Sequence, residues 1–171
     1  MKRALLALIA LGAGQAEAAR PACVEPRDMR TVIAVALPEA VEGLADHCMA
    51  ALSGDAFLPN NGALLAARYR HEMPVDPAKA RQAIQSATGQ DLSSFASDDT
   101  VTNLAGQFIR DQIDHHVPMR DCGAADDMVA LAAPLRADAM VEAILLALEI
   151  AGADQMKGLA VCQPKDEGAS R

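Results

Sequence analysis

The residue types available for a core constrain this chain more than any other feature. Alanine supplies 37 of the 171 residues, whereas Phe, Tyr and Trp together supply four. The β-branched residues that favour strands are scarce, and no segment alternates apolar and polar residues with a period of two. Apolar types still make up 51% of the chain, which is enough for a folded core. We therefore predict an all-α, compact domain of about six to eight closely packed helices.

Apolar spacing and turn residues place the first expected helices. Residues 29–37 and 41–52 each carry an apolar stripe at helical spacing. Pro38 stands between these stripes, which predicts that one helix ends there and a second begins. The sequence Asn-Asn-Gly at 60–62 predicts a turn before a helix that runs to Tyr69.

The later helices have clearer boundaries. Asp76 followed by Pro77 is a typical helix start and Gly89 a typical end, so residues 77–88 are predicted to be helical. A longer helix is expected after Asp98 and Asp99. Residues 135–151 are apolar over most of the helix circumference, which predicts that they form the central helix.

The first 18 residues have the three-part pattern of a secretory signal peptide. A positive start is followed by an apolar run at 4–13 and by an A-x-A cleavage site. The run is too short to cross a bilayer, and residues 135–151 are interrupted by charges, so we expect no membrane insertion of the mature form. The predicted location is the periplasm or the exterior. The predicted division is a signal peptide at 1–18, one domain at 19–162 and a frayed polar tail at 163–171.

Four cysteines follow the predicted cleavage site, and an even number in an exported chain favours disulfide bonds. They are Cys23, Cys48, Cys122 and Cys162. An internal repeat suggests their pairing, because the segments after Cys23 and Cys122 both continue through Asp-Met and a proline to a second cysteine. If the repeat is real, two helical hairpins flank a middle section, closed by the bonds Cys23 to Cys48 and Cys122 to Cys162. Chance similarity within an alanine-rich chain is the alternative.

A wider set of positions carries a family resemblance. The set comprises Cys23, Pro38, Cys48, Phe57, Leu58, Gly62, Leu65, Arg68 and Tyr69, together with the segment from Cys122 through Pro134 and Leu135. In these positions the chain resembles exported, disulfide-containing helical proteins of alphaproteobacteria. The resemblance covers most of the mature chain. It implies export and disulfide bonds, and it implies no particular activity.

One cluster has the residue types of a metal site. Asp111, Asp114 and His115 lie three and four positions apart, so on a helix they share one face and offer ligands to a divalent metal. The alternative is that they form the solvated side of that helix.

A second cluster is basic. It offers a site for an anionic ligand or an acidic surface, and it consists of Arg68, Arg70, Lys79 and Arg81. The alternative is that these side chains are the solvated ends of two helices.

The charge balance bears on the class of partner. A net charge of -8 repels phosphate, and four aromatic residues cannot build a stacking platform, so no nucleic acid partner is expected. The chain contains no zinc-protease, phosphate-loop or nucleophile-elbow motif, and no cofactor is predicted. We expect a non-enzymatic exported protein that binds another protein or assembles with itself. The alternative is a protein that binds a small ligand or a divalent metal.

Overall fold

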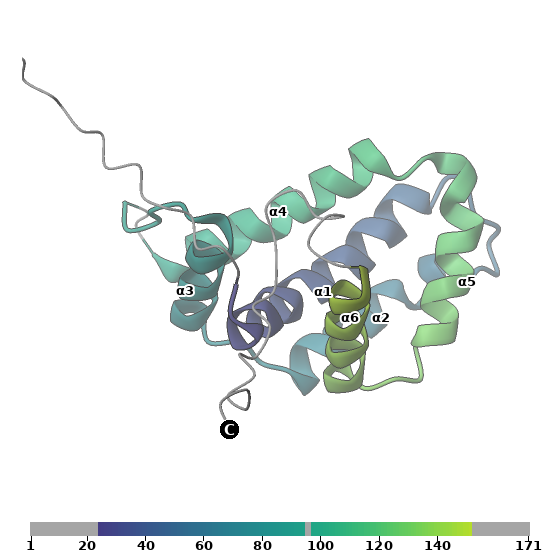
Figure 1. Ribbon diagram of the computed structural model, residues 1–171. Coiled ribbons are helices and arrows are strands. Elements are labelled where there is room, and N and C mark those ends of the chain that lie inside the picture. The colour runs from purple at the N-terminus through teal and green to yellow at the C-terminus, as the bar shows by residue number, and fades with distance from the viewer. Residues whose placement is uncertain (1–23, 95–96, 152–171) are drawn as a thin grey trace, which may run out of the picture.

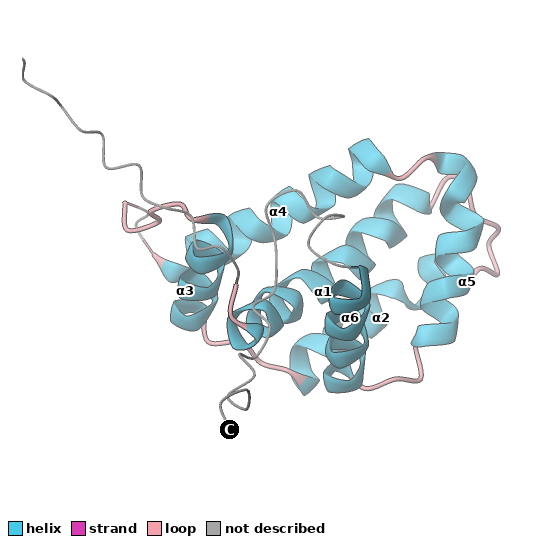
Figure 2. Cartoon of the chain, viewed as in Figure 1, coloured by secondary structure: helices cyan, strands magenta, loops and turns pink. Residues whose placement is uncertain are grey.

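The computed structural model describes residues 24–94 and 97–151, and within these ranges it contains helices and loops without a strand (Figures 1 and 2). Its elements are α1 (Pro26–Cys48), α2 (Phe57–Glu72), α3 (Pro77–Thr88), α4 (Asp98–His116), the short 3-10 helix η1 (Met119–Asp121), α5 (Cys122–Ala132) and α6 (Ala137–Ala151). The prediction of a compact all-α fold is confirmed. The predicted signal peptide, Cys23, Cys162 and the predicted tail lie outside the described residues.

α1 is the central helix, because it packs against each of the other five α-helices described here. In Figure 1, α4 runs beside α1 and α5 crosses near its carboxyl end. The prediction that residues 135–151 form the central helix is wrong. α6 packs on α1 with one face and leaves Leu146 and Ile150 57% and 78% exposed on the other. Among the described residues, no helix is both long enough and apolar enough to span a membrane.

Pro38 lies inside α1 and does not end it, so the predicted helical hairpin at residues 29–52 is wrong. A proline in a helix interior costs about 3 kcal/mol because it removes one backbone hydrogen bond and crowds the preceding turn. The buried face of α1 continues across this position through Val35, Pro38 and Val41. Packing of that face against the surrounding helices offsets the local cost, and residues 26–48 form one helix of 23 residues.

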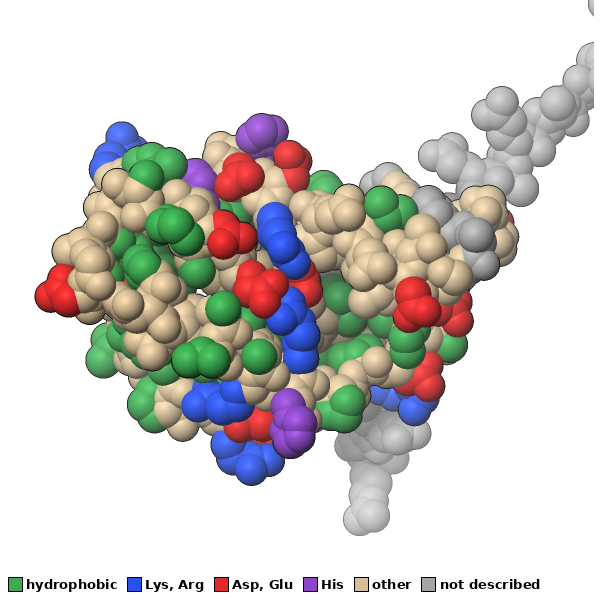
Figure 3. All heavy atoms as spheres, turned by 180° about the vertical axis from the view of Figure 1, so that it is seen from behind, with side chains coloured by type: hydrophobic (Ala, Val, Ile, Leu, Met, Phe, Trp, Pro, Cys, Tyr) green, Lys and Arg blue, Asp and Glu red, His purple; other side chains and the backbone are tan. Residues whose placement is uncertain are grey.

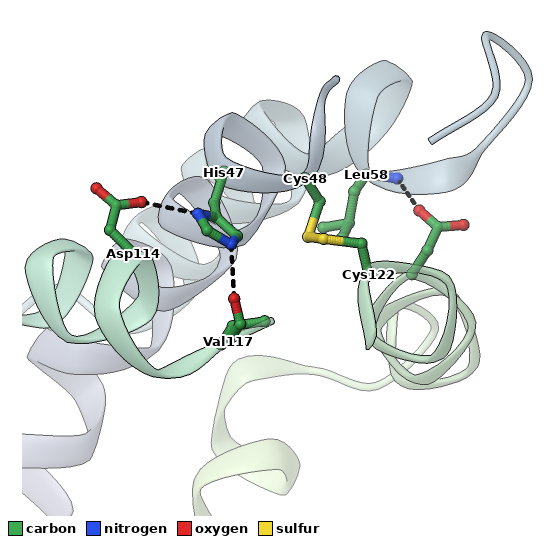
Figure 4. Close-up of a disulfide and its surroundings, with 7 residues drawn as sticks. His47, Cys48, Leu58, Asp114, Val117 and Cys122 are labelled. Carbon is green, nitrogen blue, oxygen red and sulfur yellow. Dashed lines mark hydrogen bonds and ion pairs between the residues drawn. A yellow bond between two sulfur atoms is a disulfide. The ribbon is translucent and has the colours of Figure 1, made fainter. Parts of the chain in front are cut away.

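The described disulfide bond joins Cys48 to Cys122, with a Cα–Cα distance of 5.4 Å (Figure 4). The predicted pairings of Cys23 with Cys48 and of Cys122 with Cys162 are therefore wrong. The unbroken α1 explains the first error, since 23 helical residues span about 34 Å and separate the start of this segment from Cys48. The repeat behind the prediction is not structural either, because Met29 is buried whereas Met128 is 66% exposed.

Residues that typically start or end a helix predict its boundaries correctly where packing against other helices does not oppose them. The side chain of Asp76 accepts hydrogen bonds from the backbone N–H groups of Ala78 and Lys79, at 2.8 and 3.2 Å. Gly89 adopts φ 67° and ends α3, so the predicted helix at 77–88 is confirmed. The predicted turn at 60–62 is wrong, because those residues lie within α2.

Two helices are capped by side chains from elsewhere in the chain. Asp126 of α5 accepts hydrogen bonds from the backbone N–H groups of Phe57 and Leu58, at 3.0 and 2.6 Å. Glu72, in the last turn of α2, accepts one from Ala137 at the start of α6, at 2.8 Å. Carboxylates are favourable at helix N-termini, where N–H groups lack partners within the helix. These contacts fix α2 to α5 at one end and to α6 at the other.

Small residues allow α1 and α2 to approach closely. A Cβ added at Gly62 of α2 would lie 2.7 Å from the Cβ of Ala45 in α1. Ala66 is fully buried one turn further along α2, near Leu65 and Val41 in the same core cluster. The alanine content therefore serves close helix packing, as the composition suggests.

Replacing Gly62 with alanine is expected to lower the free energy of unfolding by about 1–3 kcal/mol, because the added methyl group forces α1 and α2 apart. The matched control is Gly123→Ala in α5, where an added Cβ meets nothing within 4 Å. That change is expected to stabilise the protein by up to about 1 kcal/mol through helix propensity. Urea denaturation of both variants measures the difference, and equal effects at the two sites would contradict the close approach.

Candidate binding groove

A groove of about 600 Å³ lies between α1, α4 and the segment that joins α2 to α3. Its floor is formed by Ala34, Val35 and Pro38 of α1. One wall is α4, with Thr102, Asn103, Gly106 and Gln107, and the opposite wall is the segment Met73, Pro74 and Val75. We call this feature the α1–α4 groove.

One end of the α1–α4 groove is formed by Glu39, Arg70 and Arg110, which belong to a network of four charged residues that also includes Glu42. Glu39 and Glu42 lie three positions apart on α1, so both carboxylates face the same neighbours. Arg70 of α2 donates to Glu39 at 2.7 Å and to Glu42 at 2.6 Å. Arg110 of α4 donates through Nε to Glu39 at 3.0 Å and through Nη2 to both carboxylates. Figure 3 shows basic and acidic side chains alternating in a band on one face of the molecule.

The network perturbs the ionisation of its members. Partial burial raises the pKa of Glu39, but hydrogen bonds from Arg70 and Arg110 outweigh this effect and leave the pKa below its ordinary value of 4.5. The hydrogen bond from Arg70 also lowers the pKa of Glu42. The hydrogen bond to Glu39 raises the pKa of Arg110. All four groups are therefore charged at neutral pH, and the network as a whole carries no net charge.

The close approach of α4 to α1 depends on two glycines. A Cβ added at Gly106 would lie 3.0 Å from the carboxylate of Glu39. A Cβ added at Gly43 of α1 would lie 2.9 Å from the Ile113 side chain and 3.3 Å from that of Arg110. The glycines leave room for the charged side chains to meet between the helices.

Replacing Arg110 with glutamine is expected to lower the free energy of unfolding by about 1 kcal/mol near neutral pH, a value that allows for its 43% exposure. Because the folded-state pKa values of Glu39 and Glu42 are lowered, their contribution is present above pH 4.5 and is lost as the pH falls through the lower values. The difference in the free energy of unfolding between Arg110→Gln and the wild type should therefore become smaller below about pH 4.

Arg27→Gln is the matched control for this experiment, because Arg27 is 84% exposed and contacts only the adjacent Asp28, at 3.7 Å, among the ion pairs described. It removes the same charge and is expected to change the free energy of unfolding by less than about 0.5 kcal/mol at any pH. Urea denaturation at pH 3.5, 5 and 7 measures both variants. Equal losses for the two arginines would show that the network contributes nothing specific.

The four residues of the predicted basic cluster do not form one site. Arg68 donates to the carbonyl groups of Ala133 and Leu135 in the loop before α6. Arg70 points instead to Glu39 and Glu42 of α1, since two helical positions turn the side chain by about 200°. Arg81 donates to the Leu92 carbonyl and pairs with Asp98, and Lys79 is exposed in the first turn of α3. Only Arg70 reaches the α1–α4 groove.

The three predicted metal ligands are also separated. Asp111 and His115 face each other at 3.6 Å on the exposed side of α4. Asp114 turns toward α1, where its Oδ1 lies 3.0 Å from Nδ1 of His47 (Figure 4). Within residues 24–94 and 97–151, no three His, Cys, Asp or Glu side chains are arranged to hold a metal ion.

His47 of α1 makes a further contact with α4 that the sequence did not indicate. Its Nε2 lies 2.8 Å from the carbonyl oxygen of Val117, the residue that ends α4 (Figure 4). The side chain is 9% exposed and lies in the last turn of α1, next to Cys48 in the sequence. It therefore joins the carboxyl ends of α1 and α4 next to the disulfide bond.

Sequence reasoning missed the α1–α4 groove because its residues come from separate helices. Glu39 and Arg110 are 71 positions apart, and neither belongs to a local motif. The signals present were a pair of carboxylates at helical spacing, Glu39 with Glu42, and a glycine within each of two predicted helices, Gly43 and Gly106. Such signals indicate a close helix contact, but they do not identify the partner helix.

Comparisons of the chain with family models, with curated proteins and with solved structures found no match. The resemblance to exported helical proteins of alphaproteobacteria therefore stays a prediction.

Proposed function

We propose that this protein is exported to the periplasm and acts there by binding another protein, with the α1–α4 groove as its binding site. The observation that carries the proposal is the groove: an apolar floor, a wall of hydroxyl and amide groups, and a charged end held by three helices. Protein interfaces commonly combine an apolar centre with a polar rim that forms hydrogen bonds.

Export is supported by the signal-peptide pattern and by the Cys48–Cys122 bond. Both sulfur-bearing side chains are buried, at 0% and 1% exposure, so the bond is part of the core. Structural disulfides of this kind form and persist in oxidising compartments.

Photo-crosslinking in the native compartment tests the binding role. A benzoylphenylalanine at Gln107, an exposed residue of the α1–α4 groove, is expected to crosslink a defined partner protein. The same group at Leu131, which is 81% exposed on α5, is the positional control and is expected to give no such product.

A blocking variant makes this test specific. Asn103→Trp fills the groove from an exposed position and is expected to abolish the Gln107 crosslink. Phe108→Trp is the matched control, because Phe108 is 62% exposed on another side of α4 and does not line the groove. A crosslink that survives Asn103→Trp, or that forms equally from Leu131, would overturn the groove as the binding site.

A small ligand in the same groove is the second candidate, because 600 Å³ lies within the range typical of small-molecule sites. Native mass spectrometry of the protein from its exported fraction tests it directly. A retained mass that is lost in the Asn103→Trp variant would favour the small ligand over a protein partner.

A further inference from the structure

The α1–α4 groove has one row of amide groups. Asn103 and Gln107 lie four positions apart on α4, so their side chains project about 6 Å from each other along one wall. Each amide offers both a donor and an acceptor. An extended peptide presents N–H and C=O groups on one edge at every second residue, a repeat of about 6.6 Å. The two spacings match closely enough for both amides to bond the same peptide edge.

The floor of the α1–α4 groove is apolar and belongs to the buried face of α1. It consists of Ala34, Val35 and Pro38. It therefore offers a packing surface without charge to small apolar side chains of a ligand.

The charges and residue types of the α1–α4 groove narrow the class of ligand. Arg70 and Arg110 are balanced by Glu39 and Glu42, so the charged end has no excess of either sign to hold a free anion or cation. No aromatic side chain lines the groove, so it offers no stacking surface to a planar ring or a sugar. The groups that remain in the groove are amides beside small apolar side chains. These groups can bond the main chain of an uncharged polypeptide and contact its apolar side chains.

We infer that the α1–α4 groove binds an extended, uncharged segment of the partner protein chiefly through its main chain. Asn103 and Gln107 bond alternate residues of one edge of the segment, and the small apolar side chains of the segment lie on Val35 and Pro38. This inference rests on the proposed protein-binding role and specifies what the groove recognises.

A displayed library of random seven-residue peptides is the probe. Peptides selected on the wild-type protein are expected to bind at least tenfold more weakly to Asn103→Ala/Gln107→Ala. Gln82→Ala/Gln85→Ala is the matched control, because it removes two exposed amides from α3 and is expected to leave binding unchanged.

N-methylation of the selected peptide at each position in turn identifies main-chain recognition. Two positions separated by one residue are expected to lose about tenfold in affinity, and the Asn103→Ala/Gln107→Ala variant should lose this sensitivity.

These outcomes separate the inference from the proposed function. If no peptide depends on the groove amides, or if N-methylation has no effect at alternate positions, main-chain recognition is overturned. A groove-specific crosslink obtained alongside that result would leave the binding role in place, with a folded surface as the partner. Loss of the crosslink as well would overturn both.

Discussion

Replacing Cys48 and Cys122 together with alanine is expected to lower the free energy of unfolding by about 4 kcal/mol. The bond closes a loop between residues 74 positions apart, and loops of this length restrict the unfolded chain strongly. It also joins the end of α1 to the start of α5, two buried sites in the folded chain. For a domain of this size the melting temperature should fall by about 10–15 °C, which thermal denaturation of the oxidised proteins measures.

The matched control is Cys23→Ala/Cys162→Ala, which keeps the described bond. With Cys48 bonded to Cys122, these two positions outside the described residues are the only other intramolecular pair in an oxidised chain. Non-reducing peptide mapping of the wild-type protein is expected to show the peptide that links Cys48 to Cys122. A link from Cys48 to another cysteine in the wild type would contradict the assignment. A decrease of less than about 1 kcal/mol in the free energy of unfolding of Cys48→Ala/Cys122→Ala would also contradict it.

Helix boundaries could be predicted from the sequence where the signal is local and exposed. Asp76, Pro77 and Gly89 specify α3 by hydrogen bonding and backbone conformation within a few residues of each end. Pro38 is an equally strong local signal, and it failed because α1 is surrounded by five other helices. The same competition places the Asn-Asn-Gly sequence at 60–62 inside α2, where Gly62 is required for contact with Ala45.

The α1–α4 groove depends on which helices pack together, and the sequence pattern did not indicate this. Arg70 appeared with Arg68 as part of one basic cluster, yet the helix directs them to different neighbours. Asp114 appeared as a metal ligand beside His115, yet it contacts His47 from a helix 67 positions away. In each case the residue types suited the predicted site, but side chains that were grouped together point away from one another, and their partners are set by how α1, α2 and α4 pack.

Asp126→Ala is expected to be the second most damaging change, lowering the free energy of unfolding by about 2–4 kcal/mol. α2 has no cap of its own, since Ala56 at its N-cap provides no side-chain hydrogen bond. The carboxylate of Asp126 therefore serves the N–H groups of Phe57 and Leu58, and Leu58 is 1% exposed. Its removal leaves the buried N–H of Leu58 and the partly buried N–H of Phe57 without partners, which costs more than the loss of an exposed cap.

The adjacent Asp127 provides the matched control, because its side chain is exposed on the same helix and Asp127→Ala removes the same charge. The free energy of unfolding of that variant, measured by urea denaturation, is expected to fall by less than about 0.5 kcal/mol. Asp126→Asn should fall between the two, since one amide oxygen remains to accept a hydrogen bond. Equal decreases in the free energy of unfolding for Asp126→Ala and Asp127→Ala would contradict the role of Asp126 as the cap of α2.

Hydrogen exchange distinguishes the loss of this cap from a general loss of stability. Asp126 lies one turn from Cys122 on α5, so the cap and the disulfide bond hold the same helix to its neighbours. In Asp126→Ala, the Phe57 and Leu58 amides should exchange faster than global unfolding allows, while those in the middle of α1 follow the global rate. In Cys48→Ala/Cys122→Ala, the cap remains and both sets should follow the global rate. Because either change releases α5, their combined effect on unfolding should be smaller than the sum of the two.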